Sequence, residues 1–146
     1  MSTTSHSRSI HIDAPVEKVF DYVKDPRHYY DAYWQEQKPG VTEVQLAPEA
    51  GVGSTWSWIG HWLFVYLHGT STREEYVANE RIVDRSSTGG SFTFTFEPDE
   101  AGTTLTLEIA VSMPVPLADK VIDALAWQRD RDLDTMLGNL KTAIET

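Results

Sequence analysis

The sequence predicts an α+β fold in which a curved antiparallel sheet of about six or seven strands wraps around one long C-terminal helix. Three observations lead to this prediction. Two short stretches of helical spacing follow the first strand, the middle of the chain alternates with the period of strands, and residues 117–144 carry one broad apolar stripe. A sheet with one apolar face and a single amphipathic helix bury both surfaces most simply when the sheet curls around the helix.

The N-terminal elements are predicted to be a strand and two short helices. Ser9 to Asp13 alternates between polar and apolar residues, which is typical of a strand, and the polar residues 1–7 are expected to form a flexible tail. Asp13-Ala14-Pro15 then supplies a helix N-cap with proline in the first turn. Asp25-Pro26 repeats this signal and opens a second short helix, which extends to about residue 34.

Strand-like alternation dominates the segment from residue 41 to residue 111. Turn residues interrupt it at 48–51, 79–80, 88–90 and 98–102, and connections this short join antiparallel neighbours. The predicted strands are 41–46, 55–59, 67–77, 81–86, 91–97 and 104–111.

The C-terminal segment returns to helical spacing. After Pro114 and Pro116 the chain runs to residue 144 without proline, so we expect one long helix. The chain contains no internal repeat, low-complexity tract or linker, which predicts a single domain over residues 1–146. The apolar stripe of the helix consists of Val121, Ile122, Leu125, Ala126, Leu133, Met136, Leu137, Leu140 and Ile144.

Composition excludes several classes of function. The 146 residues include no cysteine, which excludes a disulfide framework, thiolate zinc sites and thiol catalysis. The 22 acidic and 12 basic residues give a net charge of −10, which argues against a nucleic-acid partner. No apolar segment reaches the ~18 residues of a membrane span, and the N-terminus lacks the pattern of a signal peptide. We therefore expect a soluble cytoplasmic protein with no membrane span.

Four stretches carry a resemblance to a known superfamily. They are Ile10 to Phe20 (IHIDAPVEKVF), Gly51 to Ser54 (GVGS), Arg73 to Val77 (REEYV) and Met136 to Lys141 (MLGNLK). In this order, which covers nearly the whole chain, they resemble the START-like or helix-grip superfamily (SRPBCC), which includes polyketide cyclases and dehydratases and lipid-transfer domains. The resemblance implies a cavity between the curved sheet and the long helix that binds a hydrophobic small molecule. It implies no universal catalytic residues.

Aromatic residues make up 11% of the chain and gather in three clusters on elements that would surround such a cavity. Trp56 and Trp58 share one face of their predicted strand, as do Phe92 and Phe94 in a later one. Rings with polar handles line pockets for flat ligands, although a packed aromatic core is the alternative explanation. The predicted ligand-binding residues are Tyr33, Trp56, Trp58, Tyr66, Phe92, Phe94 and Leu125.

Two residues are candidates for catalysis. Arg129 falls on the apolar stripe of the long helix, and a buried guanidinium needs a partner. That partner could be a ligand carboxylate, carbonyl or phenolate; the alternatives are Asp84 or Glu74, or an arginine that reaches solvent at an edge. His68 could act as a general acid or base if its face of the strand points inward. If that face points outward, His68 is an ordinary solvated residue.

Metal and cofactor sites are not expected. His61 and His68 are seven residues apart, which places them on opposite faces of an uninterrupted strand, and neither has a neighbouring ligand at suitable spacing. The chain has no phosphate loop, nucleophile elbow or dinucleotide fingerprint.

Trp62, Leu63 and Phe64 form an apolar segment where a turn between strands is expected. Loops normally face water, so an apolar turn predicts a lid over the cavity, a contact between the subunits of a homodimer, or a membrane contact. The negative net charge disfavours anionic membranes, which leaves the lid and the homodimer contact as the favoured interpretations.

The leading hypothesis is a protein that binds a hydrophobic, aromatic or polyketide-like small molecule and catalyses its cyclisation or dehydration without a metal. In that reaction Arg129 would polarise a carbonyl, and His68 or a tyrosine would move a proton. The first alternative is a carrier or sequestering protein that has the same cavity and no chemistry. The second is a protein–protein interaction module that uses the apolar segment at residues 62–64.

Overall fold

The computed structural model describes residues 2–33, 41–62, 65–113 and 119–146, and it describes the side chains of 5–30, 32, 41–59, 68–110 and 130–146. The described strands form one antiparallel sheet in the order β1-β7-β6-β5-β4-β3-β2. The strands are β1 (Ser2–Ile12), β2 (Val41–Gln45), β3 (Thr55–Trp62), β4 (Val65–Val77), β5 (Arg81–Ser86), β6 (Ser91–Asp99) and β7 (Gly102–Met113). The helices are α1 (Val16–Val23), α2 (Pro26–Tyr33) and α3 (Asp119–Glu145), with a 3-10 turn η1 (Pro48–Ala50).

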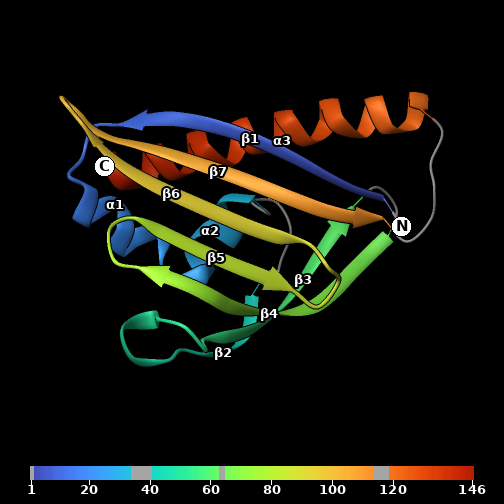
Figure 1. Cartoon of the computed structure of the whole chain (residues 1–146), viewed down its shortest axis with the longest axis horizontal. Coiled ribbons are helices and arrows are strands. Elements are labelled where there is room, and N and C mark those ends of the chain that lie inside the picture. Colours follow the sequence, from blue (N-terminus) through green and yellow to red (C-terminus); the bar gives the residue numbers. More distant parts are fainter. Residues whose placement is uncertain (1, 34–40, 63–64, 114–118) are drawn as a thin grey trace.

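The predicted α+β architecture is confirmed. Seven antiparallel strands form a curved sheet, two short helices follow the first strand, and one long helix ends the chain. Figure 1 shows that the helices lie on one face of the sheet, with α3 running beside β1 and α2, and with α1 against β6 and β7. The two edge strands, β1 and β2, lie at opposite ends of the strand order.

The first strand differs from its predicted length. β1 begins at Ser2, so residues 2–7, which the composition assigns to a flexible tail, pair with β7 in a continuous register from Ser2↔Met113 to Ile12↔Thr103. This pairing is made by backbone groups, which do not require apolar side chains. Polar side chains also suit an exposed edge strand, and that is why the alternation visible in the sequence begins only at residue 9.

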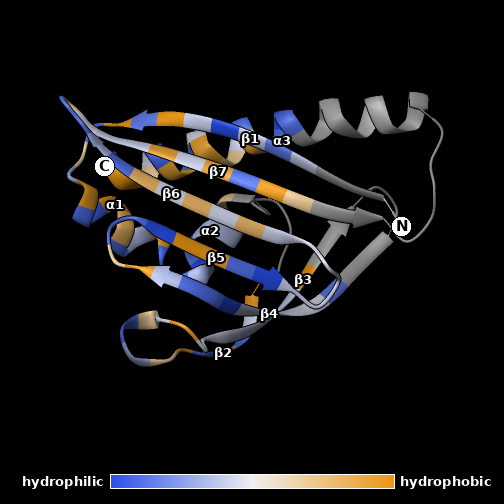
Figure 2. Ribbon diagram, viewed as in Figure 1, coloured by the Kyte–Doolittle hydropathy of each residue, from blue (hydrophilic) through white to orange (hydrophobic). Residues whose placement is uncertain are grey.

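The core lies between the inner face of the sheet and the helices. Alternation along β6 and β7 places one face of each strand inward, and α1 and the C-terminal part of α3 cover it. Phe20 of α1 packs edge-on against Phe96 of β6, with ring centroids 5.0 Å apart. Figure 2 shows the hydrophobic segments where α1 and the end of α3 meet the sheet. The core residues of these elements include Val19, Phe20, Val23, Phe94, Phe96, Leu105, Leu107, Ile109, Leu133, Met136, Leu137, Leu140 and Ile144.

A charged cluster joins the end of β1 to the β6–β7 turn and to α3. His11 bonds Asp99 through Nδ1 (2.8 Å) and Asp13 through Nε2 (2.7 Å). The last turn of α3 reaches the same place, because Lys141 donates to the His11 carbonyl and Glu145 accepts from the Asp13 N–H. A neutral imidazole has only one N–H, so donation to both carboxylates requires the imidazolium form. The hydrogen bonds to Asp99 and then Asp13 accordingly raise the pKa of His11.

This cluster predicts a pH dependence of stability. Because the pKa of His11 is raised in the folded protein, its stabilising contribution is complete below about pH 6.5, the ordinary histidine value, and is lost as the pH rises through the folded-state pKa. The lowered pKa values of Asp99 and Glu145 keep both carboxylates ionised across this window. We expect urea denaturation to show a stability gap between the wild type and His11→Gln that is larger at about pH 5.5 than at about pH 8.5. A gap that does not change with pH would contradict this assignment.

Candidate functional site

The inner face of the sheet contains a fully buried ion pair. Arg73 of β4 and Asp84 of β5 lie opposite each other in the register, and both side chains are excluded from solvent. The pair is bidentate, with Arg73 Nε donating to Asp84 Oδ1 (2.8 Å) and Nη2 donating to Oδ2 (2.9 Å). Tyr29 of α2 donates a third hydrogen bond to Asp84 Oδ2 (2.7 Å). A buried ion pair contributes favourably only when its remaining polar atoms are also bonded, and these contacts meet that condition for the carboxylate.

The same guanidinium connects the sheet to the segments around it. Arg73 Nη1 donates to the Lys24 carbonyl at the end of α1 (2.7 Å) and to the Ala50 carbonyl in η1 (2.8 Å). Its central carbon lies 5.4 Å from the ring centroid of Trp56, within the range of a cation–π contact. One side chain of β4 therefore fixes α1, η1 and β3 relative to β5.

The protonation states of this network follow from its surroundings. Burial alone would lower the pKa of Arg73, but the hydrogen bonds and the negative charge of Asp84 outweigh it and raise that pKa. Burial, followed by the charge of Asp84, raises the pKa of the Tyr29 phenol well above its ordinary value. Arg73 stays charged and Tyr29 stays protonated, so the network persists as a set of donors around one carboxylate.

An aromatic cluster lies next to this network, with Tyr30 of α2 at its centre. The ring centroid of Tyr30 is 6.5 Å from that of Trp56, 6.4 Å from that of Trp58 and 5.9 Å from that of Phe92. Its hydroxyl lies 3.3 Å from Ser71 Oγ on the inner face of β4. The helix α2 thus carries a ring that touches aromatic residues of two different strands.

Burial is less complete at the end of the inner face that lies farther from α1. On β6 the exposed fraction is 3% for Phe96 and 0% for Phe94, whereas Phe92 is only partly buried. On β3 it rises from 1% for Trp56 to 8% for Trp58. At the end farther from α1 the packed core therefore gives way to a partly buried ring, Phe92, which lies beside the buried ring of Tyr30.

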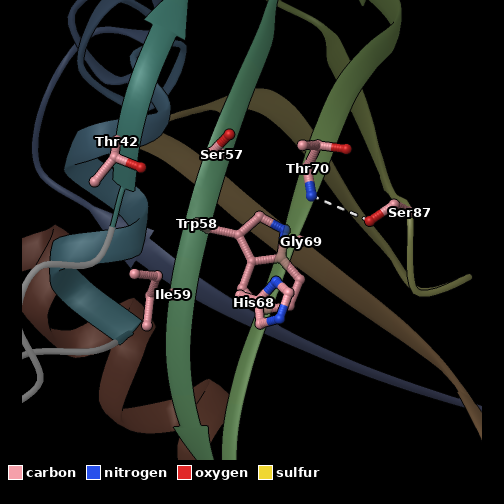
Figure 3. A pocket seen from close by; sticks show the side chains of 8 residues that line it. All are labelled: Thr42, Ser57, Trp58, Ile59, His68, Gly69, Thr70 and Ser87. Atoms are coloured by element: carbon pink, nitrogen blue, oxygen red, sulfur yellow. Dashed lines mark hydrogen bonds between the residues drawn. The ribbon is translucent and has the colours of Figure 1, made fainter.

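The position of the Trp58 ring depends on a glycine in the neighbouring strand. Trp58 lies opposite Gly69 in the register, and Figure 3 shows its ring extending from β3 over β4 at that glycine. A Cβ atom at residue 69 would lie only 2.9 Å from Trp58 Cζ2 and 2.9 Å from Ser87 Oγ. Gly69 is therefore required for the ring to lie flat against β4.

Two buried donors in this region have no hydrogen-bond partner. They are the indole nitrogens of Trp56 and Trp58, and in the part of the chain with described side chains they are the only buried side-chain nitrogen or oxygen atoms in this condition. An unsatisfied buried donor costs about 1–3 kcal/mol, and native proteins contain few of them. Both indoles therefore require an explanation beyond core packing.

An open groove of about 450 Å³ lies along β2, β3 and β4 and is lined both by outward-facing residues and by Trp58. It is lined mainly by residues of β2, β3 and β4 and by Ser87, whose hydroxyl accepts a hydrogen bond from the Thr70 N–H (3.1 Å; Figure 3). His68 and Thr70 are exposed on the outer face, whereas Ser71 and Arg73 point inward. The complete lining is Thr42, Ser57, Trp58, Ile59, His68, Gly69, Thr70 and Ser87.

These observations locate the predicted site residues. The structure brings Trp56, Trp58, Phe92 and Phe94 together on the inner face, and it places His68 on the opposite face. The role of His68 in catalysis stays a prediction; His68 lines the open groove together with Trp58, but its side chain is exposed, whereas both tryptophans are buried. The side chains of Tyr33, Trp62, Tyr66, Leu125 and Arg129 lie outside the described part, as do residues Leu63 and Phe64 entirely.

The residues that organise the site, Arg73 and Asp84, are not evident as a pair in the sequence. Asp84 and Glu74 are candidate partners of Arg129 from the sequence, but Asp84 pairs with Arg73, and Glu74 accepts a hydrogen bond from Arg85 (2.8 Å). The pairing of Arg73 with Asp84 cannot be read from the sequence because β4 contains a bulge, where the register shifts between Arg73↔Asp84 and Glu75↔Val83. If residue pairs were counted back from the turn between β4 and β5 without this bulge, Arg73 would lie opposite Arg85, which has the same charge.

The described residues show no metal centre and no membrane helix. No group of three His, Asp or Glu side chains in this part of the chain could hold a metal ion. No described helix is both long enough and apolar enough to cross a membrane.

The buried ion pair predicts a large effect of removing one charge. Asp84→Asn keeps the shape of the side chain but leaves the Arg73 guanidinium buried without a counter-charge, so we expect the free energy of unfolding to fall by about 3–5 kcal/mol. Glu74→Gln is a matched control, because the Glu74–Arg85 pair joins the same two strands at the exposed surface and should contribute less than about 1 kcal/mol. Urea denaturation measures both, and equal losses in the two variants would contradict the prediction.

A second prediction concerns Gly69. We expect Gly69→Ala to lower the free energy of unfolding by about 1–3 kcal/mol, because the methyl group forces the Trp58 ring or the Ser87 side chain to move. The near-ultraviolet circular dichroism spectrum should change as well. Gly138→Ala is the control, since a Cβ there would meet nothing within 4 Å and alanine favours a helix interior by about 0.5–1 kcal/mol. An unchanged spectrum and stability for Gly69→Ala would show that the ring does not depend on this glycine.

Comparisons with known proteins agree with this architecture. The family model described as polyketide cyclase / dehydrase and lipid transport matches residues 3–145. A search of curated protein sequences finds no match.

Several solved structures share the fold. An aromatase/cyclase, ZhuI of Streptomyces sp. R1128, is 16% identical with a TM-score of 0.73, over 99% of this chain and 94% of its own. The protein TTHA0849 of Thermus thermophilus is 18% identical with a TM-score of 0.70, over 98% and 97% of the two chains. The di-domain ARO/CYC protein BexL of the BE-7585A biosynthetic pathway is 25% identical with a TM-score of 0.65, over 99% of this chain and 50% of its own. The family match extends over nearly the whole sequence and the helix-grip architecture agrees with it, so this chain belongs to the polyketide cyclase / dehydrase and lipid transport family.

Proposed function

We propose that the chain binds a hydrophobic small molecule of aromatic or polyketide-like character against the inner face of the sheet. The observation that carries the proposal is the group of ring surfaces formed by Tyr30, Trp58 and Phe92 at the less tightly packed end of that face. Membership of a family of cyclases, dehydrases and lipid-transport proteins supports the same class of ligand.

The packing around these rings supports a flat ligand. Tyr30 lies tilted against both Trp58 and Phe92, at interplanar angles of 34° and 55°, and not edge-on as Phe20 lies against Phe96 at 67°. A flat aromatic ligand would pack against these rings in the same offset or edge-to-face arrangements that aromatic side chains adopt with one another. The partial burial of Phe92 indicates that the available surface lies at this end and not near Phe94, which is fully buried.

The ion-pair network contributes support to this surface. Arg73 and Asp84 neutralise each other, and their hydrogen bonds hold Tyr29, the residue directly before Tyr30. The ring of Tyr29 also packs against Phe92, with centroids 5.4 Å apart. The network therefore fixes the aromatic surface in place, and because its charges are already paired, the ligand gains apolar and stacking contacts with that surface and not an ion pair.

Catalysis is the finer part of the proposal. Cyclisation or dehydration by acid–base chemistry without a metal would use Arg129 to polarise a carbonyl and a nearby group to move a proton. Since His68 is exposed on the outer face, Tyr30 is the better-placed proton donor among the described residues, with its hydroxyl on the inner face near Ser71. A carrier that binds the same ligand without chemistry is the alternative, and Trp62, Leu63 and Phe64 stay candidates for a lid or a homodimer contact.

A binding experiment tests the proposal. We expect the wild type to bind 1-anilinonaphthalene-8-sulfonate, an amphiphilic aromatic probe, and Phe92→Ala to bind it about ten- to one-hundredfold more weakly, because one buried ring contributes about 1.5–3 kcal/mol. Fluorescence titration gives the dissociation constants, and thermal unfolding shows that the variant is folded. Thr72→Ala, on the exposed outer face of β4, is the matched control and should bind like the wild type.

The open groove along β2, β3 and β4 is the alternative binding site, and binding of the probe there would contradict the proposal. If Ile59→Ser weakens binding of the probe and Phe92→Ala does not, the ligand binds in the groove lined by Ile59 and His68 and the proposal is wrong. Absence of binding to the folded wild type would overturn it as well.

A further inference from the structure

We infer that the indole N–H groups of Trp56 and Trp58 donate hydrogen bonds to oxygen atoms of the ligand. The ligand class is therefore an oxygen-bearing ring system such as a polycyclic ketone, quinone or phenol, and not a plain hydrocarbon. This inference rests on the proposed function and specifies the ligand class.

The two nitrogens differ from the other buried polar groups of the site. The Arg73 nitrogens, the Tyr29 hydroxyl and the Asp84 oxygens all have partners within 3 Å, and Ser71 lies near the Tyr30 hydroxyl. The indole nitrogens alone are buried without a partner in the described part of the protein. A folded chain that satisfies a buried charge so completely has no structural reason to leave two donors unsatisfied beside it.

Their position relative to the aromatic surface points to a ligand. Residues 56 and 58 alternate with outward-facing neighbours, so both indoles are on the inner face of β3, and the two Cα atoms are about 6.8 Å apart along the strand. Both rings lie beside Tyr30, which is the centre of the proposed binding surface. A molecule stacked near Tyr30 therefore lies within reach of both tryptophans.

The chemistry of indole decides what kind of atom it must meet. Its N–H is a donor only, so its partner has to be an acceptor. Arg73, whose guanidinium lies 5.4 Å from the Trp56 ring centroid, has donors only and cannot accept from the indole N–H. A carbonyl or phenol oxygen on the ligand supplies such an acceptor, whereas a methylene group or an ammonium group supplies none.

A matched pair of probes tests the inference. Fluorenone and fluorene have nearly the same shape, but fluorenone carries a carbonyl where fluorene has a methylene group. Displacement of 1-anilinonaphthalene-8-sulfonate gives the affinity of the protein for each. We expect Trp56→Phe or Trp58→Phe to weaken fluorenone binding about fivefold, the effect of one lost hydrogen bond, and to change fluorene binding less than about twofold.

A spectroscopic measurement observes the donors directly. In protein labelled with ¹⁵N-tryptophan, the Trp→Phe variants assign the indole N–H signals of residues 56 and 58. We expect fluorenone to move at least one of these proton signals downfield, as hydrogen bonding does, and fluorene not to produce that shift. The fluorene arm corrects for ring-current effects, because the two probes place similar rings at the site.

The outcomes separate this inference from the proposed function. If neither probe displaces the dye from the folded wild type and the dye itself does not bind, the proposed function fails. If both probes bind and the Trp→Phe variants weaken them equally, or weaken neither, the surface binds aromatic ligands and the hydrogen-bonding inference is overturned. Selective loss of fluorenone binding with a downfield indole shift supports it.

Discussion

The buried ion pair between Arg73 and Asp84 is the interaction on which the rest of the inner face depends. It joins adjacent strands, but its further hydrogen bonds reach the ends of α1 and η1 and the phenol of Tyr29. Two charges removed from water are tolerated because nearly every polar atom has a partner. The aromatic surface beside the pair takes its position from this network, since Tyr29 is fixed by a hydrogen bond and Tyr30 follows it in the same short helix.

Much of the fold could be predicted from the sequence because its apolar residues repeat with clear periods. The stripe that contains Leu133, Met136 and Leu140 indicated the long helix, and the alternation of Phe94 and Phe96 indicated an inward-facing strand. Residues 2–7 escaped this prediction, since an edge strand is held by backbone hydrogen bonds and its side chains can be polar.

The candidate site was only partly predictable, and the physical cause is the register of β4. Periodicity could show that Trp56 and Trp58 share a face, but it could not show which face of β4 points inward, because Arg73 looks like a surface residue in the sequence. Its counter-charge belongs to the next strand and becomes its neighbour only through the bulge. In the sequence Tyr30 is one of several tyrosines of a predicted short helix, and its central position depends on how that helix packs against the sheet.

The extra residue in β4 divides this strand into two segments that belong to different parts of the protein. Beyond the bulge, Tyr76 packs with Phe20 in the core at the α1 end; before it, Ser71 and Arg73 face the aromatic surface. Two relatives can differ in whether this strand contains the bulge. Residues that lie before the bulge, at the same number of positions from the β4–β5 turn, then face opposite sides of the sheet in the two proteins. Within a fold shared at 16–25% identity, a single inserted residue can thus exchange the ligand-facing and solvent-facing sets of a strand while the backbone changes little.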